Sequence, residues 1–258
     1  VLVEKVNLIS LYYFSLKICL TKVFLFLFSS CAQEDFSGNE NMESIYFQTE
    51  DDVRIVGNYW KGDQRAVLLL HMMPATKESW GTFAEKLAEQ GYTVLTIDLR
   101  GHGESTNQDG EILNYKEFTD AEHQDSIADV EAAVAYMQEY GAKNISIVGA
   151  SIGANLALMY QAGHSEIQKT ILLSPGTNYY GVRTEPSAEA LQKNQEVYFI
   201  AGTLDQRKTG NAADMAKQIQ SKVPGRSEMK IYENSAHGTD LFAEDSTLMD
   251  TLIAWLKK

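Results

Sequence analysis

From residue 44 to the end of the chain, short apolar runs alternate with longer segments in which apolar residues recur at helical spacing. The run 66–70 (AVLLL) is typical of a strand that is buried on both faces. Segment 122–140 places Ile127 and Val130 on one stripe, which is typical of an amphipathic helix. The chain therefore carries the signals of both strands and helices, in alternation.

The pattern predicts eight strands, over residues 44–49, 53–59, 66–70, 93–97, 145–149, 169–173, 196–201 and 229–232. It predicts helices over residues 82–90, 122–140, 152–161, 212–222 and 248–258. The first two strands are separated by a short polar turn and are expected to form a hairpin. Repeated alternation of strand and helix predicts an α/β fold, in which helices cover both faces of a mostly parallel sheet.

The N-terminal segment differs from the rest of the chain. Lys22 is followed by the apolar run 23–28 and by two serines, which is the layout of a secretory signal. The run is too short to span a bilayer alone. The segment ending at Cys31 resembles a bacterial lipoprotein signal, which implies a lipidated Cys31 and anchoring to the cell envelope. An ordinary secretory signal cut near Ala32, giving a secreted or periplasmic protein, and a mistranslated upstream extension remain open.

These boundaries predict three parts: a signal segment over residues 1–31, a polar tether over 32–43, and a single large domain over 44–258. The 258 residues include 35 acidic and 22 basic ones, for a net charge of −13. This balance argues against a nucleic-acid partner, because Lys and Arg supply most of that affinity. It also suggests that strongly anionic substrates are repelled at low salt.

Both cysteines, Cys19 and Cys31, lie in the N-terminal segment, so the domain can have no disulfide framework and no cysteine nucleophile. The five histidines are scattered without metal-ligand spacing. We therefore expect neither a metal site nor a cofactor.

Three side chains with complementary chemistry follow buried strands. Ser151 comes after strand 145–149, Asp205 after strand 196–201, and His237 after the last strand. Open α/β sheets place their sites at the carboxyl ends of the strands, so the three side chains are expected to meet at one edge. There His237 would act as general base for Ser151, and Asp205 would orient His237. Asp240 is an alternative to Asp205 as the aspartate that orients His237, although it is better placed to cap the following turn.

Ser151 lies within Gly149-Ala150-Ser151-Ile152-Gly153, a G-x-S-x-G pentapeptide between a predicted strand and a predicted helix. In that context the serine stands on a sharp turn, with its hydroxyl clear of the sheet. The helix start then points its free N–H groups at the site, which favours a developing oxyanion. The backbone N–H of Ile152 is one predicted donor. Met73, in the loop after strand 66–70, is the other.

These motifs, together with His71-Met72-Met73-Pro74 and Asp98-Leu99-Arg100-Gly101-His102-Gly103-Glu104-Ser105, resemble the α/β-hydrolase superfamily over residues 44–258. Within it, the chain is similar to dienelactone-hydrolase-like and serine-aminopeptidase-like esterases. Met72 departs from the glycine usual in this family's oxyanion loop. The dienelactone hydrolases would have a cysteine where this chain has Ser151, so dienelactone activity is not implied.

Relatives often carry a cap domain, but the corresponding connection 174–195 is too short for one. We expect an open cleft with a small flap that carries Tyr179 and Tyr180. Candidate substrate contacts are these two tyrosines with His71 and Met72, although His71 is more simply explained as shaping its loop. Asp98, Arg100 and His102 are expected to form a structural network beside the site.

The resemblance implies a serine hydrolase that cleaves carboxylic esters through an acyl-enzyme, with a small-molecule ester or amide as its partner. A serine aminopeptidase or an acyltransferase would use the same three residues. A tethered, non-catalytic binding protein is a further alternative.

Overall fold

The computed structural model describes residues 42–258. The predicted signal segment, most of the predicted tether and the candidate lipidation site Cys31 lie outside this range. The first strand begins at Met42, so the last two residues assigned to the tether belong to the domain. Within residues 42–258, no helix combines the length and the apolar character that a membrane crossing requires.

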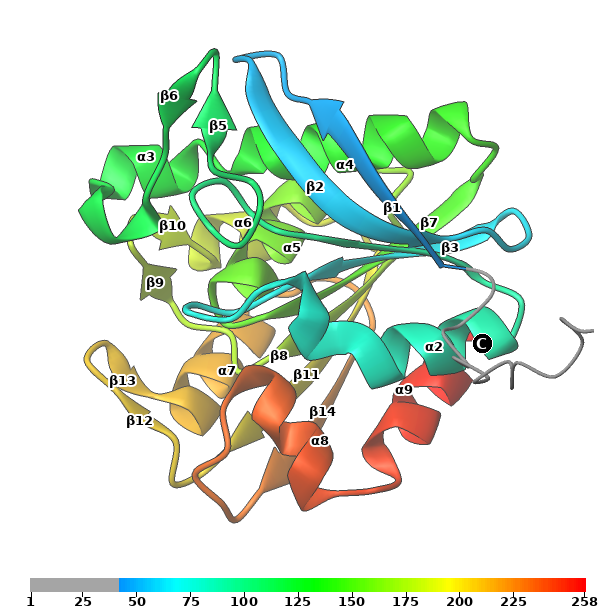
Figure 1. The fold of residues 1–258 in the computed structure, drawn as a ribbon. Coiled ribbons are helices and arrows are strands. Elements are labelled where there is room, and N and C mark those ends of the chain that lie inside the picture. Colours follow the sequence, from blue (N-terminus) through cyan, green and yellow to red (C-terminus); the bar gives the residue numbers. More distant parts are fainter. Residues whose placement is uncertain (1–41) are drawn as a thin grey trace, which may run out of the picture. The chain divides into compact units, whose positions relative to one another are not determined.

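The central sheet has its strands in the order β14-β11-β8-β7-β3-β4-β2-β5-β6, and β1 pairs with β2 over nearly the whole length of that strand (Figure 1). Its eight principal strands are β1 (Met42–Gln48), β2 (Val53–Trp60), β3 (Arg65–Leu70), β4 (Thr93–Ile97), β7 (Asn144–Ala150), β8 (Lys169–Leu173), β11 (Glu196–Gly202) and β14 (Ser227–Tyr232). The six strands from β3 onward run parallel, whereas β1 and β2 form the predicted antiparallel hairpin. All eight predicted strands are thus present.

The connections between these strands contain short antiparallel pairs of two-residue strands. They are β5 (Asn107–Gln108) with β6 (Glu111–Ile112), β9 (Asn178–Tyr179) with β10 (Val182–Arg183), and β12 (Gln206–Arg207) with β13 (Gly210–Asn211). The sheet counts ten strands because β5 pairs with β2 and carries β6 with it. Two-residue strands have too little periodicity to be predicted from the sequence.

The helices are α2 (Gly81–Glu89), α3 (Asp120–Gln124), α4 (Ile127–Glu139), α5 (Ile152–Gly163), α6 (Glu185–Ala190), α7 (Ala212–Gln220), α8 (Leu241–Glu244) and α9 (Leu248–Leu256). Single 3-10 turns are η1 (Lys77–Trp80), η2 (Tyr115–Glu117) and η3 (Gly238–Asp240). The helix predicted over 122–140 is in fact two helices. A turn at Asp125 and Ser126 separates α3 from α4, and there the N–H groups of Ser126, Ala128 and Asp129 bond to the carbonyl three residues back.

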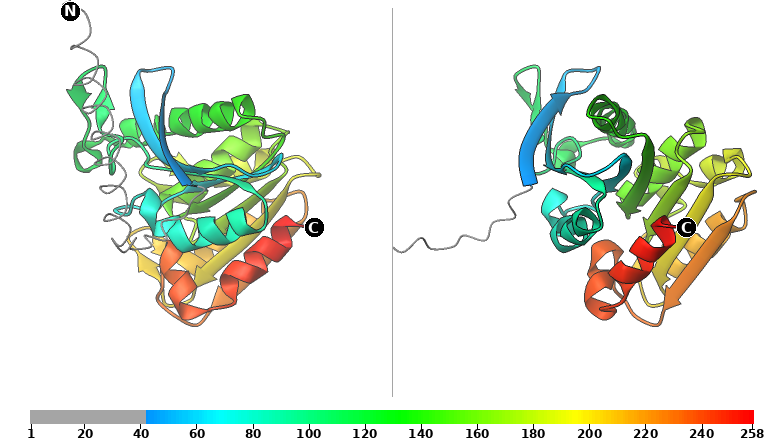
Figure 2. Two further views of the ribbon diagram at one scale, coloured as in Figure 1. Left: turned by 45° about the vertical axis from the view of Figure 1, so that its right-hand side comes forward. Right: turned by 90° about the vertical axis from the view of Figure 1, so that its right-hand side faces the viewer.

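Alternate side chains of each inner strand enter two separate cores. Leu68 and Leu70 of β3 pack with α4, α5 and α7, whereas Val67 and Leu69 pack with α2 and α9. Figure 2 shows the sheet lying between these two helix layers. Because both faces of the sheet are covered, the inner strands are almost continuously apolar, and the candidate catalytic side chains lie at the strand ends.

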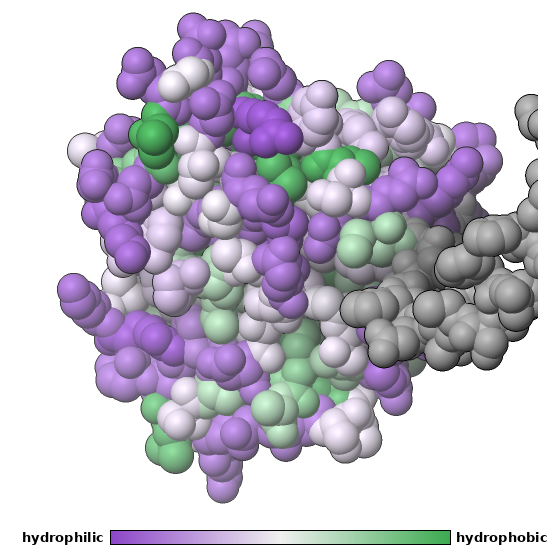
Figure 3. Space-filling view, in the orientation of Figure 1, coloured by the Kyte–Doolittle hydropathy of each residue, from purple (hydrophilic) through white to green (hydrophobic). Residues whose placement is uncertain are grey.

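The exposed apolar side chains are scattered over the domain. In Figure 3 the hydrophobic positions form small, separate patches on a mostly hydrophilic face. The large exposed apolar residues are Met42, Tyr46, Ile112, Tyr140, Tyr180 and Leu204. Tyr180 is the member of this set that also lines the cavity described below.

Candidate active site

Ser151 stands on a strained turn between β7 and α5. Its backbone has φ 53° and ψ −118°, a left-handed conformation that non-glycine residues adopt rarely and at a cost of about 1–3 kcal/mol. The turn is tight because β7 and α5 pack closely against each other at the two glycines. A methyl group at Gly149 would collide with the backbone of Gly153, and one at Gly153 with the backbone of Leu70. The two glycines of the pentapeptide therefore permit the turn that exposes the serine.

His237 and Asp205 are joined by a buried hydrogen bond. The ring Nδ1 of His237 donates to Oδ2 of Asp205 at 2.6 Å, and both residues are almost completely buried. The other carboxylate oxygen of Asp205 accepts a hydrogen bond from Nε of Arg207 at 2.7 Å. With Nδ1 bonded to the carboxylate, Nε2 is the ring nitrogen that remains to accept a proton. Asp240 makes no such bond to the His237 ring and lies in η3.

Ser174 holds the loop that carries His237 in place. The hydroxyl Oγ of Ser174 accepts a hydrogen bond from the backbone N–H of Gly238 at 3.0 Å, and Ser174 is fully buried. Ser174 directly follows β8, so the rule that selected Ser151 from its strand end would have selected this residue too. Sequence reasoning nevertheless missed it.

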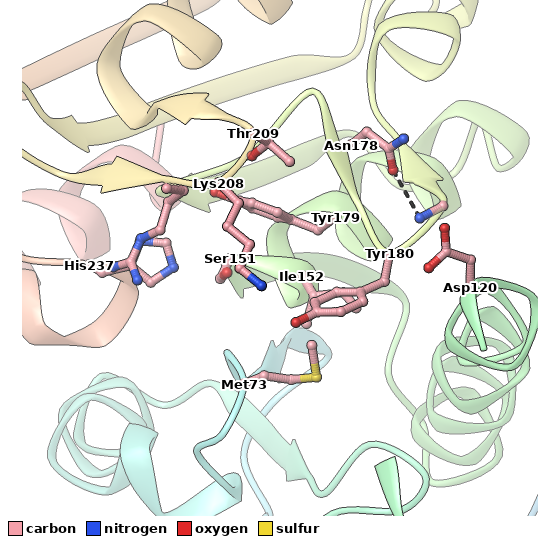
Figure 4. Close-up of a pocket in the computed structure, with 12 residues that line it drawn as sticks. Met73, Asp120, Ser151, Ile152, Asn178, Tyr179, Tyr180, Lys208, Thr209 and His237 are labelled. Carbon is pink, nitrogen blue, oxygen red and sulfur yellow. Dashed lines mark hydrogen bonds between the residues drawn. The ribbon is translucent and has the colours of Figure 1, made fainter. Parts of the chain in front are cut away.

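A cavity of about 480 Å³ lies beside Ser151 and His237 (Figure 4). Ser151 and His237 both line it, with Met73, Ile152, Tyr179 and Tyr180. The hydrogen bonds of residues 42–258 include none between the Ser151 hydroxyl and the His237 ring. Such bonds are often long in the absence of substrate and shorten in the substrate complex. The remaining lining residues, which sequence reasoning missed, are Asp120, Asn178, Gly181, Arg207, Lys208 and Thr209.

Both predicted oxyanion donors lie at the cavity. Ile152 opens α5, where the backbone N–H has no preceding helical carbonyl to bond. Met73 lies in the loop after β3. An oxyanion at this point would also benefit from the positive end of the α5 dipole.

His71 is not in the cavity, contrary to the predicted substrate contact. Its ring is fully buried; Nδ1 donates to the Met72 carbonyl at 2.9 Å, and Nε2 accepts from the Leu99 N–H at 3.0 Å. Burial lowers the pKa of His71 to about 4, so the ring is neutral at pH 7. Its side chain joins the β3 and β4 loops, and the two backbone partners leave it no free polar atom for a substrate.

Met72 does not line the cavity either. Its side chain packs against the apolar core beneath α2 and α9. The sulfur also lies over Gly238, so that a methyl group at Gly238 would press against it. Methionine in place of the family's glycine therefore fills space behind the His237 loop.

Asp98, Arg100 and His102 are buried, but their hydrogen bonds form two separate groups instead of the single network expected: His102 bonds the Arg100 carbonyl, whereas Asp98 bonds neither. Asp98 accepts hydrogen bonds from the backbone N–H and the ammonium of Lys77, each at 2.8 Å. Arg100 bonds Asp129 at 2.8 Å. Burial lowers the pKa of His102 to about 4. None of these residues reaches the cavity, so their chemistry serves the loops around it.

Among residues 42–258, no group of three or more histidine, cysteine or acidic side chains is arranged to hold a metal ion. The charged groups that line the cavity are Asp120, Arg207 and Lys208, with His237 as the titratable ring.

Comparison with known proteins agrees with this architecture. Residues 65–237 match the family model described as the alpha/beta hydrolase fold. The chain belongs to the alpha/beta hydrolase fold family. The match runs from the start of β3 to His237, and so includes each strand end that supplies a candidate catalytic side chain.

Curated relatives share part of this family domain. The chain is 26% identical to the AB hydrolase superfamily protein YisY of Bacillus subtilis over 179 residues, which are 69% of this chain and 61% of YisY. It is 25% identical to a carboxymethylenebutenolidase of Rhodococcus opacus over 159 residues, 60% of this chain and 62% of that enzyme. The chain thus spans less than two thirds of the length of these relatives.

Solved esterases have the same fold. An esterase of Pyrococcus furiosus aligns with a TM-score of 0.68 and 19% identity, covering 84% of this chain and 91% of that one. An esterase of Exiguobacterium antarcticum aligns with a TM-score of 0.64 and 15% identity, covering 84% and 100%.

Proposed function

We propose that this protein is a serine hydrolase that cleaves carboxylic esters through an acyl-enzyme. The proposal depends on the buried 2.6 Å hydrogen bond from His237 to Asp205, and on the cavity that both His237 and the strained Ser151 line. A histidine held by a carboxylate, facing a serine at a helix start, is the arrangement that activates a hydroxyl for acyl transfer. The esterase fold of the solved relatives agrees with this chemistry.

In the first half-reaction, Nε2 of His237 takes the Ser151 proton as the serine oxygen attacks the acyl carbon. The negative charge that develops on the carbonyl oxygen is stabilised by the backbone N–H of Ile152 and by that of Met73. Asp205 holds the ring in one tautomer and stabilises the imidazolium. His237 then returns the proton to the leaving alcohol, and water attacks the acyl-enzyme by the same route.

The test is hydrolysis of short p-nitrophenyl esters by the wild type and by Ser151→Ala. We expect the variant to lose at least about 10⁴-fold in kcat/KM, because nucleophile and base act as a unit. A fluorophosphonate probe should label the wild type at Ser151. Ser221→Ala, at an exposed position after α7, is the matched control and should behave as wild type. Retained turnover in Ser151→Ala would refute the mechanism, and folded wild type that the probe does not label would favour a non-catalytic binding protein.

A serine aminopeptidase is the second candidate, because Asp120 places a carboxylate on the cavity wall. Such a group can hold the protonated amino terminus of a peptide. An amino-acyl amide hydrolysed faster than the matching ester, with the advantage lost in Asp120→Asn, would favour this activity over simple ester cleavage.

A further inference from the structure

The net charge of the chain does not describe the charge inside the cavity. Of the fixed charges on the cavity wall, Arg207 and Lys208 are cationic, and Asp120 is the opposing carboxylate. The two cations are adjacent residues of the β12–β13 hairpin, which follows Asp205 directly. In a protein with 35 acidic and 22 basic residues, two neighbouring cations at the candidate active site are a local reversal of sign.

Lys208 has no ionic partner among the described residues. The carboxylate nearest to it in sequence, Asp205, already accepts from His237 on one oxygen and from Arg207 on the other. No hydrogen bond or ion pair within residues 42–258 involves the Lys208 ammonium. Figure 4 shows its side chain extending into the cavity that Ser151 lines, while Asp120 lies at the opposite side.

Arg207 adds further donors on the same wall. It uses Nε for Asp205, and its two terminal nitrogens bond to no other group in the described part of the chain. The guanidinium is therefore fixed in place by one bond, with its remaining N–H groups free to bind an anion.

We propose that Lys208 and Arg207 form an anion subsite, and that the substrate is an ester whose acyl part carries a carboxylate. This inference rests on the proposed ester hydrolysis and specifies its substrate class. A flat carboxylate suits one ammonium and one guanidinium edge, since each of its oxygens accepts a charge-assisted hydrogen bond. A cavity of about 480 Å³ holds a small dicarboxylic acid monoester. The repulsion suggested by the net charge is thus offset where the substrate binds.

The experiment compares monomethyl glutarate with methyl valerate, a pair that differs in a terminal carboxylate. The measured quantity is the ratio of their kcat/KM values, with the Ser151→Ala protein as the background for each. We expect the wild type to favour the anionic ester by about tenfold, which is the scale of one charge-assisted bond at a partly exposed site. Lys208→Gln should lower the ratio several-fold, with Arg207 retaining part of the preference, and Lys208→Glu should lower it further, to below one.

Lys217→Gln is the control, because Lys217 lies on α7 and pairs with Asp214 outside the cavity. It should retain the wild-type ratio. A wild type that hydrolyses methyl valerate through Ser151 but shows no preference for the anionic ester would overturn the anion subsite alone. An undiminished preference in Lys208→Gln would overturn it as well. Absence of Ser151-dependent turnover of both esters would instead refute the proposed function.

Discussion

Arg207 shares the carboxylate of Asp205 with His237. Nε of Arg207 donates to Oδ1 at 2.7 Å while Nδ1 of His237 donates to Oδ2 at 2.6 Å, so both oxygens of the buried carboxylate are bonded. The guanidinium thereby fixes the orientation of the carboxylate that holds the His237 ring.

Arg207→Gln should lower kcat several-fold, because the carboxylate that orients His237 loses one of its two charged hydrogen-bond donors. Arg207→Lys can still donate one hydrogen bond to the carboxylate and should retain more of kcat than Arg207→Gln. Steady-state kinetics with neutral p-nitrophenyl esters measure the effect. Wild-type kcat in Arg207→Gln would show that the arginine does not position Asp205.

Ser174→Ala should weaken both the fold and catalysis. The substitution leaves the buried N–H of Gly238 without its acceptor, which costs about 1–3 kcal/mol of unfolding free energy. Because Gly238 follows His237, we also expect kcat to fall several-fold with KM little changed. Urea unfolding and steady-state kinetics measure the two effects. Stability and kcat equal to those of the exposed variant Ser221→Ala would show that this bond contributes nothing.

The free energy of unfolding should fall as the pH drops from about 6.5 to 4. His71 and His102 have an ordinary pKa near 6.5 and a folded pKa of about 4, in each case because burial disfavours the charged ring. The unfolded chain therefore binds more protons in this window, and stability present above pH 6.5 is lost as the pH falls through 4. For His71 the full loss is about 3 kcal/mol.

Thermal unfolding across this pH window measures the effect. In His71→Gln the slope should be smaller than in the wild type, since one of the buried titrating rings is gone. His164→Gln is the control, because His164 is only half-buried and stacks on Tyr160. A slope that is the same in all three proteins would contradict the assignment to the buried ring.

Lys77→Met should destabilise the domain strongly. Lys77 is buried, and its ammonium pairs with the fully buried Asp98 at 2.8 Å. Burial opposes the charged form of Lys77, but the hydrogen bonds that its ammonium donates to Asp98 and Glu104 outweigh this effect and raise the pKa of Lys77. Removing one partner leaves an uncompensated charge in the interior, at a cost of about 3–5 kcal/mol. Denaturant unfolding should show that the double variant Lys77→Met, Asp98→Asn recovers part of this loss; if it is less stable than Lys77→Met alone, the pairing argument is wrong.

The amino-acid sequence by itself determined the order of strands and helices and the α/β class. Buried parallel strands are mostly apolar along their length, so runs such as Ala66–Leu70 are visible without a structure. The same rule placed Ser151, Asp205 and His237 at strand ends, because catalytic side chains of open α/β sheets lie where the buried strands stop. That is why the candidate catalytic side chains can be named from the sequence.

Only the tertiary structure decided what surrounds them. Lys208 and Asp120 lie in a hairpin turn and at a helix start, where no hydrophobic period indicates which way a side chain points. The sequence favoured a loop-shaping role for His71 and left a substrate contact open, and the burial of the ring between two backbone groups agrees with the loop role. Pairings across long sequence separations, such as Ser174 with Gly238, depend on which strand ends become neighbours in the sheet. Local sequence carries the apolar periods that form the elements, whereas the contacts between loops exist only after those elements have packed.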